Sequence, residues 1–165
     1  MSIKKPSVII SDEPFDLAAL NHVIQSSEGE NGASVIFTGC VRVSDEESGL
    51  TGMTLEHYPG MTESLLEDIL SQAAARWHLT RVLVAHRVGH LLPGETIVFV
   101  GICALHRKEA FEAAEFVMDY LKNQATFWKK EHYAPSSNKT DTWVDAKQTD
   151  LESLKRWQGK FDSIR

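Results

Sequence analysis

The sequence predicts an α+β fold, and three observations support this prediction. Residues 95–103, ETIVFVGIC, form the most apolar run of the chain and are typical of a central strand. Residues 108–122 place apolar side chains at helical spacing, which indicates an amphipathic helix. Strand-like and helix-like segments are mixed without the regular alternation of a parallel βαβ sheet, so an α+β arrangement is favoured.

The elements expected in the first part of the chain follow from local signals. A short apolar run predicts a strand at 7–10, and residues 11–14 supply cap and first-turn chemistry for a helix to about residue 26. A turn cluster rich in Gly and Asn ends that helix. We then expect strands at 33–38 and 53–58, with a polar loop at 43–52 between them.

In the second part of the chain, two helices surround a hairpin. Thr62 is expected to cap a helix to about residue 77, whose apolar face contains Leu65, Leu66, Ile69, Leu70 and Ala73. Strands at 81–88 and 95–103 are expected to pair across a turn at 89–94. The apolar face expected for the 108–122 helix consists of Ala110, Phe111, Ala114, Val117, Met118 and Leu121. A loop at 133–140 and a short strand at 142–146 complete the expectation.

Length and composition fit one soluble domain. The chain has 165 residues, of which 42% are hydrophobic and 24% charged, and we expect a single domain over 1–165 with a fraying tail at 150–165. No apolar run approaches the roughly 20 residues of a membrane helix, and the N-terminus lacks the apolar core of a signal peptide. Two cysteines are too few for a disulfide framework, so we expect a reducing, cytoplasmic setting.

The charge of the chain limits the kind of ligand that it can bind. The net charge is −6, with −7 carried by residues 1–102 and +1 by residues 103–165. A general nucleic-acid binder usually has a basic stripe and a high isoelectric point, whereas the value here is about 5.6. An anionic ligand is therefore expected to bind to a few local basic groups.

The first candidate site follows the expected central strand. His106 and Arg107 open the long helix, where free backbone N–H groups and a partial positive charge favour anions. An arginine at this place can hold a phosphate or carboxylate through two hydrogen bonds. In the alternative interpretation His106 caps the helix locally and Arg107 pairs with Glu109 or Glu112.

The second candidate pair is Lys122 and Lys129. If the helix continues to Lys129, the two lysines share a face, about 20° out of register and roughly 10 Å apart along the axis. A lysine that is close to other cations and partly shielded from water releases its proton more easily and can act in catalysis. The alternative is that both lysines only extend to solvent near a helix C-terminus, where cations are favoured.

The strand end at Cys40 and Arg42 also has two interpretations. Cys40 is a sulfur nucleophile assisted by Arg42, or Arg42 is the functional residue and Cys40 a small half-buried thiol. The sequence contains no HExxH or CxxC motif, no phosphate-binding loop and no dinucleotide fingerprint, so we expect neither a metal nor a cofactor.

Several long stretches together resemble a known family. They read GASVIFTGCVR, LEHYPGMTE, HRVGHLLPGETIVFVGICALHRKEAFEAAEFVMDYLK, FWKKE and WVDA. In this order and spacing they are similar to the large, catalytic subunit of molybdopterin synthase, and they span most of the chain up to the WVDA stretch. The number and length of these stretches make the resemblance more specific than any single motif above.

The resemblance implies an activity and an assembly. It implies a sulfurtransferase of molybdenum cofactor biosynthesis that converts cyclic pyranopterin monophosphate to molybdopterin. Sulfur would come from the C-terminal Gly-Gly thiocarboxylate of a small ubiquitin-like subunit, whose tail enters a pocket of the large subunit. A homodimer of large subunits would bind one small subunit at each end, giving a heterotetramer. The implied fold is of the α/β-hammerhead type with an additional antiparallel β-containing subdomain.

Site residues are implied where the motifs match. Lys122, after DYL, and Lys129, after FW, would be catalytic. The substrate-binding residues would be Cys40, Val41, Arg42, His106, Arg107, Lys122, Lys129, Lys130 and Glu131. The chain departs from relatives at three positions: Cys40 where Lys is frequent, Thr126 where Pro is usual, and Lys147 where some relatives have an Arg that reaches the neighbouring protomer's site.

These residues give one main hypothesis and two rivals. In the main hypothesis Arg42, His106 and Arg107 hold the phosphate and pterin. Lys122 assists sulfur attack by proton transfer or holds the terminal carbonyl of the donor tail, and Lys129 places the anion. The first rival is a Cys40 persulfide sulfurtransferase that needs no ubiquitin-like donor. The second is a non-catalytic protein that only binds a ubiquitin-like tail.

Overall fold

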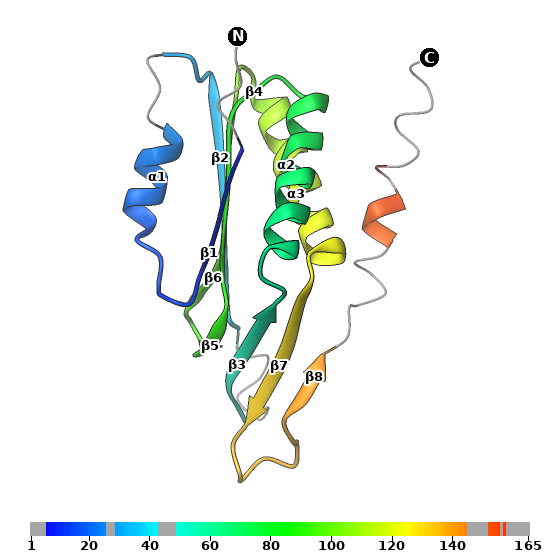
Figure 1. Ribbon diagram of the computed structural model, residues 1–165. Coiled ribbons are helices and arrows are strands. Elements are labelled where there is room, and N and C mark those ends of the chain that lie inside the picture. Colours follow the sequence, from blue (N-terminus) through cyan, green and yellow to red (C-terminus); the bar gives the residue numbers. More distant parts are fainter. Residues whose placement is uncertain (1–5, 26–28, 43–48, 145–151, 156, 158–165) are drawn as a thin grey trace.

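A computed structural model describes residues 6–25, 29–42, 49–144, 152–155 and 157. It contains two four-stranded sheets and three longer helices (Figure 1). In chain order the elements are β1 (Ser7–Ser11), α1 (Leu17–Gln25), β2 (Ala33–Cys40), β3 (Leu50–His57), α2 (Met61–Arg76), β4 (Leu79–Arg87), β5 (Gly89–Leu91), β6 (Thr96–Ala104), α3 (Arg107–Gln124), β7 (Phe127–Tyr133) and β8 (Thr142–Val144). The predicted α+β fold with an additional antiparallel part is confirmed.

The first sheet has the strand order β1-β4-β6-β2 and forms the centre of the molecule. β1 pairs with β4 in parallel, whereas β6 pairs antiparallel with both β4 and β2. β6 is buried along most of its length, as its continuous apolar sequence predicts for an inner strand covered on both faces. The predicted antiparallel pairing of the two apolar runs is therefore confirmed.

Helices cover both faces of this sheet. α2 and α3 lie together on one face and α1 lies on the other (Figure 1). The α2 and α3 side holds the larger apolar cluster, which includes Leu70, Val100 and Phe116, and the α1 side holds a smaller cluster around Ile24 and Phe99. None of the helices among the described residues is long and apolar enough to cross a membrane.

The second sheet, with the order β5-β3-β7-β8, is antiparallel and extends from one end of the first (Figure 1). The two sheets meet at an apolar cluster that we call the seam. The seam consists of Val41, Met53, Leu55 and Leu91, with Ile97 and Phe127 packed against it. Phe127 also packs against the large cluster under α2 and α3, so one aromatic ring joins the two parts.

Several expected boundaries are wrong for local reasons. α1 begins at Leu17, because the Asp16 carboxylate accepts a hydrogen bond from the Ala19 N–H and so takes the capping role expected of residues 11–14. β3 begins at Leu50 inside the expected 43–52 loop, where it pairs with β7, and residues 43–48 lie outside the described residues. The expected 89–94 turn contains strand β5, which pairs with β3.

Thr62 does not cap α2. Gly60 takes the N-cap position, and its N–H donates to the carboxylate of Glu63, one turn into the helix. Thr62 is buried instead, and its hydroxyl accepts from the Tyr58 N–H and bonds the Thr126 hydroxyl at 2.8 Å. The threonine pair thereby connects the start of α2 to the link between α3 and β7.

The buried faces of α2 and α3 mostly follow the predicted spacing, although Leu65 of α2 is only partly buried. Phe111 was expected on the apolar face of α3 but is 63% exposed. Ala113, Phe116 and Tyr120 are buried in addition to most of the predicted positions, because α3 packs against α2 as well as against the sheet.

Of the tail expected at 150–165, the structure describes residues 152–155 and 157. Residues 152–155 are helical, and Trp157 is only 2% exposed. The Trp157 indole N–H donates to the Asp119 carboxylate at 2.7 Å, and its ring meets Trp77 and Phe116 edge to face. Buried tryptophans contribute strongly to stability when the N–H finds a partner.

We predict that Trp157→Ala lowers the free energy of unfolding by about 3 kcal/mol, because it leaves a cavity against α3. Trp128→Ala is the matched control, since Trp128 is 50% exposed, and it should cost less than about 1 kcal/mol. Urea unfolding followed by circular dichroism measures both values. Equal losses in the two variants would contradict the docking of Trp157.

Candidate functional site

The first part of the candidate site is the end of β2. The pairing register with β6 shifts between Gly39 and Cys40, so that Cys40 pairs with Thr96 and Ile97 is passed over. Such irregularities redirect the strand end. Val41 then enters the seam, where it is buried, and Arg42 is exposed. Cys40 is also exposed, with its Sγ 3.9 Å from the Thr96 hydroxyl. The interpretation of Cys40 as a half-buried thiol is therefore wrong.

The second part of the site lies on β7. The Lys129 ammonium is 3.0 Å from the Glu131 carboxylate, which also accepts a hydrogen bond from the Tyr133 hydroxyl at 2.7 Å. The bond from Tyr133, and then the bond and charge of Lys129, lower the pKa of the Glu131 carboxyl, although partial burial opposes them. The same bond raises the pKa of Tyr133. Glu131 thus carries a negative charge that holds Lys129 in place.

Lys130 lies on the other face of β7. Its ammonium stands 6.0 Å from the centre of the Trp143 ring, and Trp128 and Trp143 are both 50% exposed. By contrast, Trp157 is buried in the core under α2 and α3, and Trp77 packs against it. Because residues alternate along a strand, Lys129 and Lys130 cannot face the same ligand on one side of the sheet.

The third part of the site is the last turn of α3, which contains Lys122 as an exposed residue. The helix does not continue to Lys129, so this condition for a shared helical face is not met. The helix ends at Gln124, Ala125 is extended, and the chain enters β7 at Phe127 because this segment pairs with β3. Lys129 is therefore placed by strand pairing, and the helical register between the two lysines does not apply.

These three parts lie at one end of the first sheet. Lys129 pairs with Leu55, a residue of the seam, so it lies on the face of the second sheet that contacts Val41. Lys122 is five residues before Phe127, which packs against the seam. The seam thus brings the strand end with Arg42, the helix end with Lys122 and the β7 lysine into one region of the molecule.

His106 and Arg107 lie at the start of α3, beside a shallow pocket lined by Gly32, Leu105, His106, Arg107 and Lys108. A Cβ atom at Gly32 would stand 2.0 Å from the Leu105 carbonyl oxygen, so only glycine permits this close approach. Both basic residues are exposed, and the His106 side chain makes no capping hydrogen bond. The pocket therefore presents an open, basic helix N-terminus.

The alternative pairing of Arg107 is wrong among the described residues. Glu109 contacts His78 at 3.3 Å, and Glu112 accepts a hydrogen bond from the Trp77 indole at 3.1 Å. Both carboxylates thus have partners on or beside α2. A cation in the first turn of a helix also opposes the helix dipole, so Arg107 gains no stability there.

Within one chain, the start and the end of α3 are far apart. From Thr96, near Arg42, to Ala104, near His106, β6 spans roughly 26 Å. From Arg107 to Lys122, α3 spans roughly 22 Å. A single phosphate cannot contact Arg42 and Arg107 of the same chain. The structure groups Cys40, Val41, Arg42, Lys122, Lys129 and Glu131 at one end and leaves His106 and Arg107 at the other; Lys147 lies outside the described residues.

The sequence by itself does not identify two residues that contact the site, Tyr133 and His86. Tyr133, which holds Glu131, is two residues after the FWKKE stretch and is the last residue of β7, although the sequence predicts a loop from residue 133. Buried His86 stacks on Phe127 with ring centres 4.0 Å apart, and its Nδ1–H donates to the Arg87 carbonyl at 2.8 Å. Among the described residues no group of three or more His, Cys, Asp or Glu is arranged to hold a metal ion.

The chain is similar to known proteins over most of its length. A family model described as MoaE protein matches residues 10–124. A relative from Escherichia coli, named molybdopterin synthase catalytic subunit, is 44% identical over 150 residues, which are 91% of this chain and 97% of that protein. A solved structure from Burkholderia ambifaria, named molybdopterin biosynthesis MoaE protein, is 44% identical with a TM-score of 0.77, covering 93% of this chain and 98% of that one.

One further likeness concerns the fold alone. A chain in a complex of subunits 1 and 2 of molybdopterin-converting factor from Helicobacter pylori has a TM-score of 0.69 at 22% identity, over 86% of this chain and 90% of that one. The relatives named above place this chain in the molybdopterin synthase class of enzymes. The chain belongs to the MoaE family.

We predict a pH dependence of stability from His86 beside the seam. Burial lowers the pKa of His86 from 6.5 to about 4, so below pH 6.5 the unfolded chain binds a proton that the folded chain does not. This contribution to stability is complete above pH 6.5 and is lost as the pH falls towards 4, by up to about 3 kcal/mol. His86→Phe should remove it in urea unfolding between pH 4 and 7. The control His78→Gln, at an exposed histidine, should retain it; an unchanged slope in His86→Phe would contradict the assignment.

Proposed function

We propose that this chain converts cyclic pyranopterin monophosphate to molybdopterin, with sulfur taken from the C-terminal thiocarboxylate of a small ubiquitin-like subunit. The observation that carries the proposal is the grouping of Arg42, Lys122 and Lys129 at one end of the first sheet. Both proposed ligands are anions, whereas the chain as a whole is acidic with a net charge of −6. Local cations are therefore needed where these ligands meet.

The proposed partner has support from a protein of the same fold. The Helicobacter pylori structure is described as a complex of two subunits of molybdopterin-converting factor. By analogy, a small subunit with a Gly-Gly thiocarboxylate tail is the sulfur donor here, and a homodimer with two small subunits forms a cytoplasmic heterotetramer. The Arg42 end of the molecule, with its exposed strand end and helix end, is where the tail would enter.

Each cation has a distinct proposed role. Arg42 binds the substrate phosphate, since a guanidinium matches two phosphate oxygens at once. Lys122 either transfers a proton during sulfur attack or holds the terminal carbonyl of the donor tail. Lys129 places the anion, and the Lys129–Glu131–Tyr133 contacts restrict its ammonium to one position before substrate binds.

His106 and Arg107 take part in the proposal through the homodimer. Because they lie more than roughly 20 Å from the Arg42 end of their own chain, we propose that they contact the substrate bound at the Arg42 end of the second copy. Their exposure and the open pocket at the helix N-terminus support this role. Each complete site would then be built from two chains.

We predict that Lys122→Ala lowers kcat at least 100-fold, because general acid–base groups typically contribute that much. The measurement is formation of molybdopterin from the cyclic pterin and a thiocarboxylated small subunit. Cys40→Ser, assayed in parallel, should retain turnover, since sulfur arrives on the partner. Near-normal turnover in Lys122→Ala would refute the role of Lys122, and loss of all turnover in Cys40→Ser would support the persulfide rival. Tight partner binding by wild-type protein without any product would support the non-catalytic rival.

A mixed dimer tests whether the site spans two chains. Lys122→Ala and Arg107→Ala chains with different affinity tags are expressed together, and dimers that carry both tags are purified. A shared site predicts that each pure variant is nearly inactive, whereas the mixed dimer regains about half of the wild-type rate, because one of its two sites is intact. A site within one chain predicts no recovery, and that result would contradict the proposal.

A further inference from the structure

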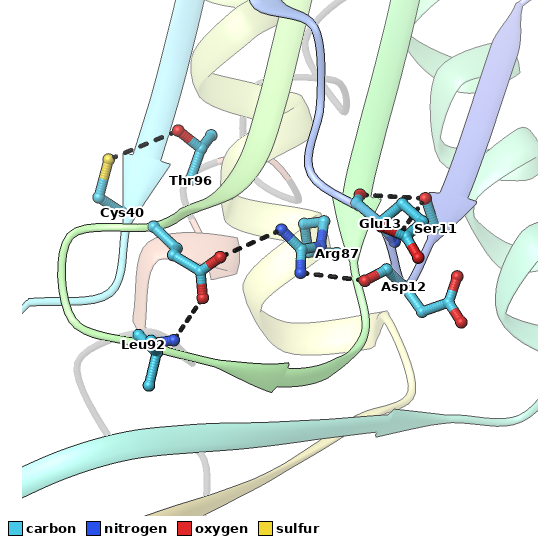
Figure 2. A network of polar contacts seen from close by, with 8 residues as sticks. Ser11, Asp12, Glu13, Cys40, Arg87, Leu92 and Thr96 are labelled. Carbon is cyan, nitrogen blue, oxygen red and sulfur yellow. Dashed lines mark hydrogen bonds and ion pairs between the residues drawn. The ribbon is translucent and has the colours of Figure 1, made fainter.

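Arg87 is a buried cation outside the described site. It is the last residue of β4 and is 4% exposed, although an isolated charge is costly to bury. Its Nη2 donates to the Asp12 carbonyl at 3.0 Å, and its Nη1 is 3.8 Å from a Glu95 carboxylate oxygen. Figure 2 shows Arg87 reaching from the sheet towards Asp12 on one side. Among the described residues its Nε has no hydrogen-bond partner.

Glu95 connects this cation to a turn at 92–95. One carboxylate oxygen of Glu95 accepts a hydrogen bond from the Leu92 N–H, and the Glu95 N–H donates to the Leu92 carbonyl at 3.1 Å. Gly94 within the turn has φ of +89°, a conformation that strains other residues. The side chain and backbone of Glu95 thus close the turn, while its charge faces Arg87.

The same turn also holds Val41, the residue before Arg42. The Val41 N–H donates to the Glu95 carbonyl at 2.9 Å, and the Gly94 N–H donates to the Val41 carbonyl at 2.8 Å. Val41 is therefore bonded on both sides to one turn, and its side chain is buried in the seam. The direction in which the chain leaves Val41, and with it the position of Arg42, depends on the placement of this turn.

We propose that Arg87 and Glu95 are positioning residues for Arg42, and that their ion pair fixes the turn so that Arg42 meets the anionic group of the substrate. This inference rests on the proposed function of Arg42 as an anion contact. An apolar pair would avoid the cost of burying charge, but it would not bond the turn and the Asp12 carbonyl together. Neither residue contacts substrate in this proposal; both act through the Val41 backbone.

The test uses Glu95→Gln as its main variant. The glutamine carbonyl can still accept the bond from the Leu92 N–H, whereas the charge opposite Arg87 is lost. We expect KM for the cyclic pterin to rise roughly tenfold with a much smaller change in kcat, since a misplaced Arg42 weakens substrate binding. Arg87→Met should give the same pattern, and Arg87→Lys, which retains a cation, should recover part of the wild-type KM.

Two controls separate positioning from folding and from the proposed function. Val84→Ala truncates a core side chain in β4, the strand of Arg87, and should lower Tm while KM stays unchanged. If KM is also unchanged in Glu95→Gln, the proposal is overturned. Arg42→Ala tests the underlying assignment: if it leaves KM unaltered, the role of Arg42 fails. If Arg42→Ala raises KM but Glu95→Gln does not, only the positioning role fails. Adding Glu95→Gln to Arg42→Ala should raise KM little further, because both act through one contact.

A measurement without turnover completes the test. Hydrogen exchange of the Val41 and Gly94 amides, which bond across the turn, should be faster in Glu95→Gln and Arg87→Met than in wild type. In Val84→Ala these amides should be accelerated no more than the other amides of the sheet. Unchanged protection of Val41 in Glu95→Gln would also overturn the proposal.

Discussion

The seam between the two sheets is the constraint on which the candidate site depends. A few apolar side chains from β3, from β5 and from the residue after β2 pack there. Phe127 contacts both this cluster and the larger cluster under α2 and α3. Arg42 directly follows Val41 of this cluster, and Lys129 pairs with Leu55 of the same cluster. Since interiors are close-packed, a shift in the seam would move the site residues together.

Polar contacts around the seam fix what apolar packing leaves open. The threonine pair of Thr62 and Thr126 ties the start of α2 to the chain leaving α3, and the histidine stacked on Phe127 is held neutral by its burial. The Arg87–Glu95 ion pair connects the end of β4 to the turn before β6, on either side of β5 in the second sheet. These contacts are directional, so they specify angles that hydrophobic packing alone does not.

The two ends of α3 differ in their electrostatics. Lys122 in the last turn agrees with the helix dipole and stabilises the helix, whereas Arg107 in the first turn opposes it. Glu109 and Glu112, which would neutralise Arg107, contact His78 and Trp77, the two residues that follow α2. The unfavourable cation is therefore consistent with an anion supplied from outside the chain.

Much of this architecture was predictable from local pattern. The strands β1, β2, β4 and β6 and the helices α2 and α3 lie close to their expected places. Burial on one face leaves a periodic apolar pattern, and burial on both faces leaves a continuous apolar run. The predictions are wrong where the secondary structure of a segment depends on a strand that is distant in sequence. β5 and the first residues of β3 are strands because other strands pair with them. The burial of Trp157 likewise depends on its contacts with Asp119 and Trp77.

For the site, the sequence by itself determined which residues carry charge and which motifs they belong to. It placed Arg42 at a strand end and His106 and Arg107 at a helix start. Only the tertiary structure decided that Lys122 and Lys129 belong to different elements, and that Arg42 and Arg107 lie at opposite ends of one chain. The physical reason is that local sequence sets the direction and period of each element, whereas distances between elements follow from packing and strand pairing over long separations.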